Sequence, residues 1–141
     1  MNNTRLNRAG RLWVWLAAAA LLTGCMRQTG WNGVFAVDLA GGAKTCVAPT
    51  MSPPDGKTVL AQIQVSNEGR WCGVTLDRGG VAYDSYVIVS RPNHGRIFAH
   101  RVGGATRIDY TPDGGFVGTD SFAVRLIPGE AVFQGAVTVT P

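Results

Sequence analysis

Three aspartates gather around one glycine-rich turn and are the first residues in this chain whose type suits chemistry. Asp109, Asp113 and Asp120 lie within one short stretch. Carboxylate oxygens are ligands that Ca²⁺ prefers, so a calcium site is one interpretation. The dense alternating aspartates of a calcium loop are missing, however. We therefore expect no metal, and we expect Asp120 to accept hydrogen bonds from backbone amides where the chain enters the next strand.

The histidines and serines offer little for catalysis. His94 lies in an expected turn and His100 in an expected strand, and neither is surrounded by a G-x-S-x-G or HExxH pattern. Ser85 and Ser121 follow aspartates, which is common where strands begin. The Gly-Gly pairs separate strands and do not join a strand to a helix, as a phosphate-binding loop does. We expect no catalytic residue and no cofactor, and an enzyme with an unrecognised site remains a minor alternative.

The amino terminus predicts an export signal. Arg5, Arg8 and Arg11 precede an apolar run from Leu12 to Leu22. That run is shorter than the roughly 20 residues that a membrane-spanning helix needs. A cleaved signal over residues 1–24 is the better interpretation.

The end of that signal resembles the lipobox of bacterial lipoproteins. Leu22-Thr23-Gly24-Cys25 places an aliphatic residue and two small ones before a cysteine. The resemblance implies thioether attachment of diacylglycerol to Cys25, cleavage after Gly24 and acylation of the new amine. Two or three acyl chains, at about 0.8 kcal/mol per buried methylene, hold a protein stably on its membrane. The alternative is a secretory signal with an incidental cysteine.

Charge and location follow from this processing. The chain has 13 basic and 9 acidic residues, but the three arginines of the signal leave with it, so ten basic residues remain and the net charge is +1. No basic run survives in the rest of the chain, which disfavours nucleic acid as a partner. We expect the protein in the cell envelope. Met26 stands where an aspartate commonly retains lipoproteins at the inner membrane, which favours the outer membrane if the source is Gram-negative.

Two cysteines remain after Cys25. An oxidising compartment favours a disulfide between Cys46 and Cys72. The chain-entropy model assigns such a loop roughly 3–4 kcal/mol of stabilisation. Two buried free thiols are the alternative, and zinc would need two further ligands.

The elements that carry these residues are β-strands. Seven segments alternate apolar and polar residues or are rich in β-branched residues. They are 58–66, 70–76, 83–90, 96–102, 106–110, 122–126 and 137–139. We expect Tyr83 to Ser90 to be a largely buried strand. Their spacing is typical of an all-β sandwich, which we place at residues 46–141.

Residues 25–45 are expected to contain the lipidated cysteine, a polar tether and one apolar segment. Trp31 to Leu39 is either a first strand or an ordered arm lying on the domain. Trp31 and Phe35 could form an exposed contact patch, but burial is the commoner position of such aromatics, and we expect it here.

The carboxy-terminal half resembles bacterial Ig-like, cadherin-like repeats of envelope and adhesin proteins. The resemblance rests on Pro92 and Gly95, on Tyr110-Thr111-Pro112, and on Phe116, Gly118 and Asp120-Ser121-Phe122. It implies an Ig-like β-sandwich. The stretch from Arg107 to Arg125 is then a structural corner in which Tyr110, Phe116 and Phe122 pack and Asp120 closes the loop.

These features favour a lipid-anchored envelope protein with a binding or scaffolding role, for example as an accessory subunit of an envelope assembly. Its expected partners are the membrane, through the anchor, and another envelope protein that could add a strand to an exposed sheet edge. The alternative from another class is a glycan-recognition module, in which Trp71, Tyr83 and Tyr86 form a stacking platform for sugars.

Overall fold

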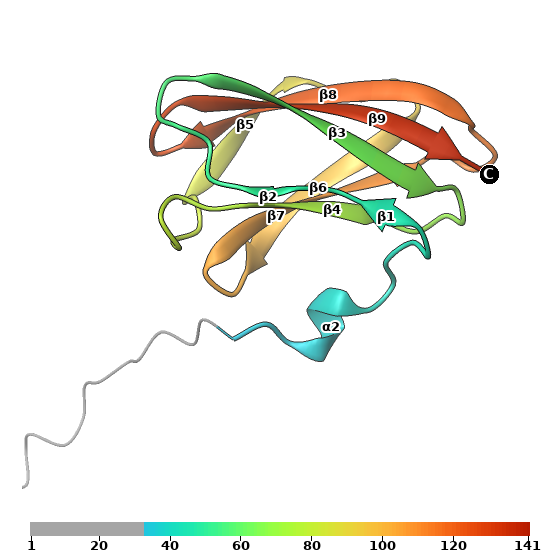
Figure 1. The fold of residues 1–141 in the computed structure, drawn as a ribbon, viewed down its shortest axis with the longest axis horizontal. Coiled ribbons are helices and arrows are strands. Elements are labelled where there is room, and N and C mark those ends of the chain that lie inside the picture. Colours follow the sequence, from blue (N-terminus) through green and yellow to red (C-terminus); the bar gives the residue numbers. More distant parts are fainter. Residues whose placement is uncertain (1–32) are drawn as a thin grey trace, which may run out of the picture. The chain divides into compact units, whose positions relative to one another are not determined.

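The computed structural model describes residues 33–141 as a β-sandwich preceded by one short helix (Figure 1). The lipobox, Cys25 and Trp31 lie outside the described residues. The elements are α2 (Ala36–Leu39), β1 (Cys46–Val47), β2 (Thr50–Met51), β3 (Thr58–Ser66), β4 (Cys72–Leu76), β5 (Ser85–Ser90), β6 (Gly95–Val102), β7 (Ala105–Pro112), β8 (Gly118–Ile127) and β9 (Ala131–Thr140). No helix in this range is long and apolar enough to cross a bilayer.

The strands form two sheets that face each other as layers (Figure 1). One sheet has the order β1-β3-β9-β8-β5 and the other has the order β2-β4-β7-β6. The adjacent sets β4-β7-β6 and β9-β8-β5 match six strands, B-E-D and G-F-C, of a seven-stranded immunoglobulin-like sandwich. β3 pairs in parallel with β9 along its whole length, and β8 and β9 form an antiparallel hairpin. The expected all-β, Ig-like sandwich is confirmed.

The core lies between the sheets and follows the alternation of the sequence. In β3, Ala61, Ile63 and Val65 are buried, while Leu60 and the two glutamines between them face outward. Successive side chains of a strand point to opposite faces, so one alternating segment supplies one wall of the core. The larger fully buried side chains come from both sheets: Tyr110, Phe122, Phe133, Ile63, Leu76, Ile108 and Leu126.

Three expectations about elements need correction. The segment before Cys46 contains the helix α2, with no strand in residues 33–45, and Phe35 is exposed where we expected burial. β5 is mostly exposed, because it lies at the edge of its sheet and has a neighbour on one side only. Two short strands, β1 and β2, were not anticipated, since two residues carry no periodic signal.

Candidate functional site

The predicted structural corner brings its residues together. The Tyr110 hydroxyl of β7 donates a hydrogen bond to Asp120 Oδ2 of β8 over 2.9 Å, which joins the two sheets. The Tyr110 ring lies parallel to that of Phe122, with 6.2 Å between centroids. Phe116 packs against the core at its margin and stacks on the imidazole of His94 at 4.2 Å. The arrangement closes one end of the sandwich.

Asp120 is the hydrogen-bond centre of this corner. Its carboxylate accepts the backbone amides of Asn93 and His94, each at 2.9 Å, and that of Ser121 at 2.8 Å. Burial raises its pKa, but these three amides and the Tyr110 hydroxyl outweigh that effect and leave the pKa of Asp120 below its ordinary value. For Tyr110, burial and then the bond to Asp120 raise the pKa. The expected capping by Asp120 is present, and it also reaches the β5–β6 turn.

The three aspartates do not converge on a common point. Asp109 pairs with Arg107, Asp120 is occupied by amides, and Asp113 is exposed in its turn. Within residues 33–141, no group of three or more His, Cys, Asp or Glu side chains is placed to hold a metal ion. The carboxylates thus serve turns and ion pairs in the described domain.

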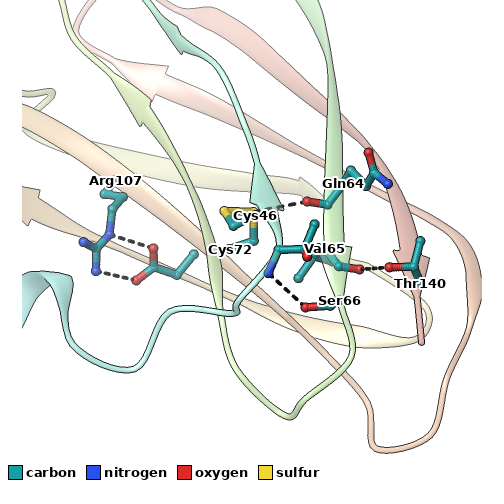
Figure 2. Close-up of a disulfide and its surroundings, with 9 residues drawn as sticks. Cys46, Gln64, Val65, Ser66, Cys72, Arg107 and Thr140 are labelled. Carbon is teal, nitrogen blue, oxygen red and sulfur yellow. Dashed lines mark hydrogen bonds and ion pairs between the residues drawn. A yellow bond between two sulfur atoms is a disulfide. The ribbon is translucent and has the colours of Figure 1, made fainter.

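Cys46 and Cys72 form the predicted disulfide, which ties the two sheets together (Figure 2). Cys46 is on β1 of the five-stranded sheet, and Cys72 is on β4 of the four-stranded sheet. The Cys72 side is fully buried and the Cys46 side is exposed. The bond therefore links the two sheets covalently on the side of the sandwich where β1 and β2 lie. Neither Cys46 nor Cys72 has a free thiol.

An ion pair that the sequence did not indicate lies on the outer face of the four-stranded sheet. Arg107 and Asp109 of β7 face away from the core, yet both are buried. Arg107 Nε and Nη2 donate to the two Asp109 oxygens over 2.7 and 3.0 Å, a bidentate pair visible in Figure 2. The guanidinium also lies 4.0 Å from the ring centroid of Trp71, within cation–π range. His100 Nε2 is 3.4 Å from Asp109 Oδ2.

This ion pair is covered by the segment 33–43, which we call the arm. Arg107 Nη1 donates to the carbonyl oxygen of Asp38 in α2. Trp71 Nε1 donates to the carbonyl of Ala40 over 3.2 Å, and the Ala43 amide donates to the carbonyl of Trp71 over 2.8 Å. The backbone of the arm thus supplies nearly every polar contact that holds it on the domain.

Of the three aromatic residues considered for sugar binding, Trp71 lies apart from Tyr83 and Tyr86, which line one cleft. Trp71 lies on the outer face of the four-stranded sheet under the Arg107 guanidinium. Tyr83 is buried, and its hydroxyl lies 3.4 Å from the Pro53 carbonyl. Tyr86 belongs to β5, on the opposite side of the sandwich from β1 and β2. The three rings do not form a flat platform.

The strongest candidate for a binding surface is the edge formed by β5, together with the cleft beside it. Both sheets end on this side, one with β5 and the other with β6. Tyr86, Val87 and Val89 of β5 are exposed large apolar side chains. A cleft of about 590 Å³ opens between the two edge strands. It is lined by Tyr83, Asp84, Ser85, Tyr86, Ala99, His100, Arg101 and Thr106.

The other sheet edges are protected in ways that β5 is not. On the opposite side, β1 and β2 are two residues long, and the chain passes between the sheets there. β6 carries Arg96 and Arg101, and charged residues commonly prevent edge pairing. β5 contains neither charge nor proline. Its pairing with β8 is irregular between Ile88 and Ser90, which leaves Ser85–Ile88 as the regular part of the edge.

Comparison with known proteins adds the following. No protein-family model matches the chain, and no curated protein matches it. Among solved structures, the chain is similar to the crystal structure of the cysteine protease inhibitor EhICP2 from Entamoeba histolytica. The similarity has a TM-score of 0.33 and 13% sequence identity, and it covers 66% of this chain and 95% of that chain. Likeness at this level carries no argument about function.

Sequence reasoning missed the β5 edge because it could not assign neighbours to strands. The signal in SYVIVS is a run of β-branched and aromatic residues, which is equally typical of a central strand. The composition therefore predicted the strand β5 correctly, but the prediction that this strand is buried was wrong. A weak clue was the absence of the clean alternation that the core strands show.

Proposed function

We propose that this chain is a lipid-anchored protein of the cell envelope that binds another envelope protein and has no catalytic role of its own. The proposal joins the lipobox-like Leu22–Cys25 sequence to the exposed β5 edge. The observation that carries the binding role is β5 itself, an uncharged edge strand with three exposed apolar side chains.

Strand addition fits the chemistry of this edge. An edge strand presents unpaired N–H and C=O groups that an extended segment of a partner can pair with. Alternate side chains of such an added strand would point toward the cleft beside Tyr86, where they would be removed from water. The partner would therefore be a protein segment in extended conformation with apolar residues at alternate positions.

The polar groups of the described domain support a binding role over catalysis. Both oxygens of Asp109 accept from Arg107, and both oxygens of Asp120 accept from backbone amides. His94 is stacked on Phe116, and Cys46 and Cys72 are bonded to each other. These contacts engage the named side chains in holding the fold.

The binding role is tested by site-specific photo-crosslinking in the native envelope. The full chain carries p-benzoylphenylalanine at Val87, with Val117 as the matched control, because Val117 is an exposed valine in the loop before β8. We expect one discrete protein adduct at position 87 and none at position 117. Adducts that are equal at both positions, or absent at 87, would contradict binding at β5.

A substitution sharpens the same experiment. Val87→Lys places a charge on the edge strand, which disfavours pairing with another strand. The side chain is exposed, so the thermal midpoint should stay close to that of the wild type. We expect the adduct formed by p-benzoylphenylalanine at Tyr86 to disappear in this variant. Its persistence would show that the partner does not use the β5 backbone.

The anchor is tested separately. Cys25→Ala removes the sulfur to which diacylglycerol would be attached, and we expect the protein to leave the membrane fraction. Gln28→Ala, three residues further along the tether, is the control and should remain in that fraction. Unchanged membrane retention of Cys25→Ala would overturn the lipid anchor. The photo-crosslinking result at β5 would not be affected.

A further inference from the structure

The arm exposes an apolar cluster that the proposed partner-binding edge does not explain. Val34, Phe35, Val37 and Leu39 lie within six residues, and each is more than half exposed to solvent. Isolated exposed apolar residues are ordinary, but four of them within six consecutive residues indicate a contact surface. We call these four residues the arm patch.

The way in which the arm is fixed explains why its side chains are free. Arg107 donates a hydrogen bond to the carbonyl oxygen of Asp38, and Trp71 donates one to the carbonyl oxygen of Ala40. The Asp38 carboxylate turns back to accept the Phe35 amide over 2.9 Å, so one of its oxygens is hydrogen-bonded within the arm. Val34 and Leu39 of the arm patch line a cleft over the sheet together with Arg107, and Phe35 and Val37 are exposed on an arm whose backbone is bonded to the sheet.

The length of chain before the arm limits what the patch can meet. Gly33, the first described residue, comes eight positions after Cys25. A fully extended chain over eight positions spans at most about 28 Å. A domain of about 100 residues has a radius of gyration of about 13 Å, so the tether is no longer than the domain is wide. An anchor at Cys25 would therefore keep the start of the arm within about 28 Å of the bilayer.

The charge near the patch suits a lipid surface. Arg27 precedes the arm in the sequence and Lys44 follows it, while Asp38 is the one acidic residue between them. Lys44 is largely exposed, and its ammonium group lies 3.8 Å from Glu68 Oε2. Apolar side chains flanked by basic residues are typical of segments that rest in the headgroup region of membranes with anionic lipids.

We propose that the arm patch rests in the lipid headgroup region and so orients the domain with the outer face of the β2-β4-β7-β6 sheet toward the bilayer. This inference rests on the lipid anchor of the proposed function. The orientation leaves the β5 edge, at the side of the sandwich, accessible to a partner protein.

The test places a photo-reactive group in the patch of the intact, lipidated chain. The protein carries p-benzoylphenylalanine at Phe35 or at Val37, and Val117 again serves as the exposed control outside the arm. The purified protein is reconstituted into vesicles of phosphatidylethanolamine and phosphatidylglycerol and irradiated, and adducts are identified by mass spectrometry. We expect phospholipid adducts at positions 35 and 37 and none at 117.

Two other outcomes would overturn the inference. One is a lipid yield at positions 35 and 37 that is no greater than at 117. The other is an adduct between two copies of the chain at these positions, which would make the patch a self-association surface. A second variant, Val37→Ser with Leu39→Ser, should reduce the lipid adduct at Phe35 and leave the thermal midpoint unchanged. An adduct that does not fall in this variant would likewise count against the patch.

The Cys25→Ala chain separates failure of this inference from failure of the anchor. If Cys25→Ala leaves the membrane fraction while the lipidated chain gives no lipid adduct at position 37, the anchor stands and the arm inference is overturned. If Cys25→Ala is retained on membranes and still gives the adduct at position 37, the anchor fails and the arm contact is supported on its own.

Discussion

Phe122 and Phe98 are both phenylalanines in β-strands, but they lie in opposite environments. Phe122 is 1% exposed between the sheets and stacks on Tyr110, whereas Phe98 is 61% exposed on the outer face of β6. The alternation of each strand decides this, because neighbouring residues point to opposite faces. The same residue type therefore contributes to the core in one strand and to the surface in the other.

We predict that Phe122→Ala lowers the free energy of unfolding by about 3–5 kcal/mol, because it removes a buried ring and leaves a cavity. Phe98→Ala is the matched control and should change it by less than about 1 kcal/mol. Urea unfolding followed by circular dichroism measures both variants. Equal losses in the two variants would remove Phe122 from its place in the core.

Arg107 and Asp109 show a different kind of burial, on a face that alternation assigns to solvent. The arm covers this face, and the bidentate pair compensates for the removal of both charges from water. Removal of one partner would leave a buried, unpaired charge. Arg107 thus contacts the arm through the Asp38 carbonyl while Asp109 balances its charge.

β5 and β3 show that strands of similar composition can also lie in different environments. Both are strands rich in apolar residues, but β3 pairs with β9 along its full length, and β5 pairs on one side only with β8. The position in the sheet leaves the β5 residues exposed and buries one face of β3. β5 is consequently the element on which we place partner binding.

The disulfide is the device that fixes the short strands β1 and β2 to the sandwich. Its two cysteines are separated by 26 positions, for which the chain-entropy model gives about 3.5 kcal/mol. We predict that the double variant Cys46→Ala, Cys72→Ala loses roughly this free energy of unfolding in urea titrations. The wild type in reducing agent is the control and should lose a similar amount. A loss below about 1 kcal/mol would mean that the unfolded chain is already compact in this region.

At the scale of the whole molecule, the two sheets are joined by two neighbouring links of different chemistry. The disulfide joins β1 to β4 through Cys72, which is the cross-strand partner of Tyr110 on β7. At the corner, Asp120 of β8 binds Tyr110 of β7 and the amides of the turn that carries the chain from β5 to β6. One of these links is covalent and the other depends on the charge of a single carboxylate.

We predict that this charge makes the stability of the domain depend on pH. The pKa of Asp120 is lower in the folded chain than its ordinary value of 3.8, so the unfolded chain binds its proton at a higher pH. Its stabilising effect is complete well above pH 3.8 and is lost as the pH falls through the folded-state pKa. The Tm of the wild type, followed by calorimetry, should fall in this range.

Asp120→Asn isolates the contribution of the corner. The amide side chain does not titrate, so the variant should start from a lower Tm near neutral pH and lose less of it on acidification. Some loss will remain, since hydrogen bonds also lower the pKa values of Asp55 and Asp77. Asp113→Asn, exposed in the same loop, is the control and should follow the wild type. If the Tm of Asp120→Asn fell with pH as steeply as that of the wild type, the Asp120 carboxylate would be excluded as the titrating group.

Much of the fold was predictable because its causes are local. Alternation over Thr58–Ser66 and Arg70–Leu76 and the pairing of the two cysteines were all expected, and the structure contains each of them. The aromatic and acidic residues of the corner were also identified as a group. A strand displays its buried face within a few residues of sequence.

The tertiary structure alone decided which strand is an edge and which outer face is covered. Nothing within Ser85–Ser90 records that β8 is its one neighbour, and nothing within Arg107–Asp109 records that the arm lies over it. Both facts depend on contacts between segments far apart in the chain, whereas the periodicity of a strand depends only on its own residues. The lipobox-like sequence determines the expectation of an anchor, and the surfaces proposed to meet lipid and protein come from those long-range contacts.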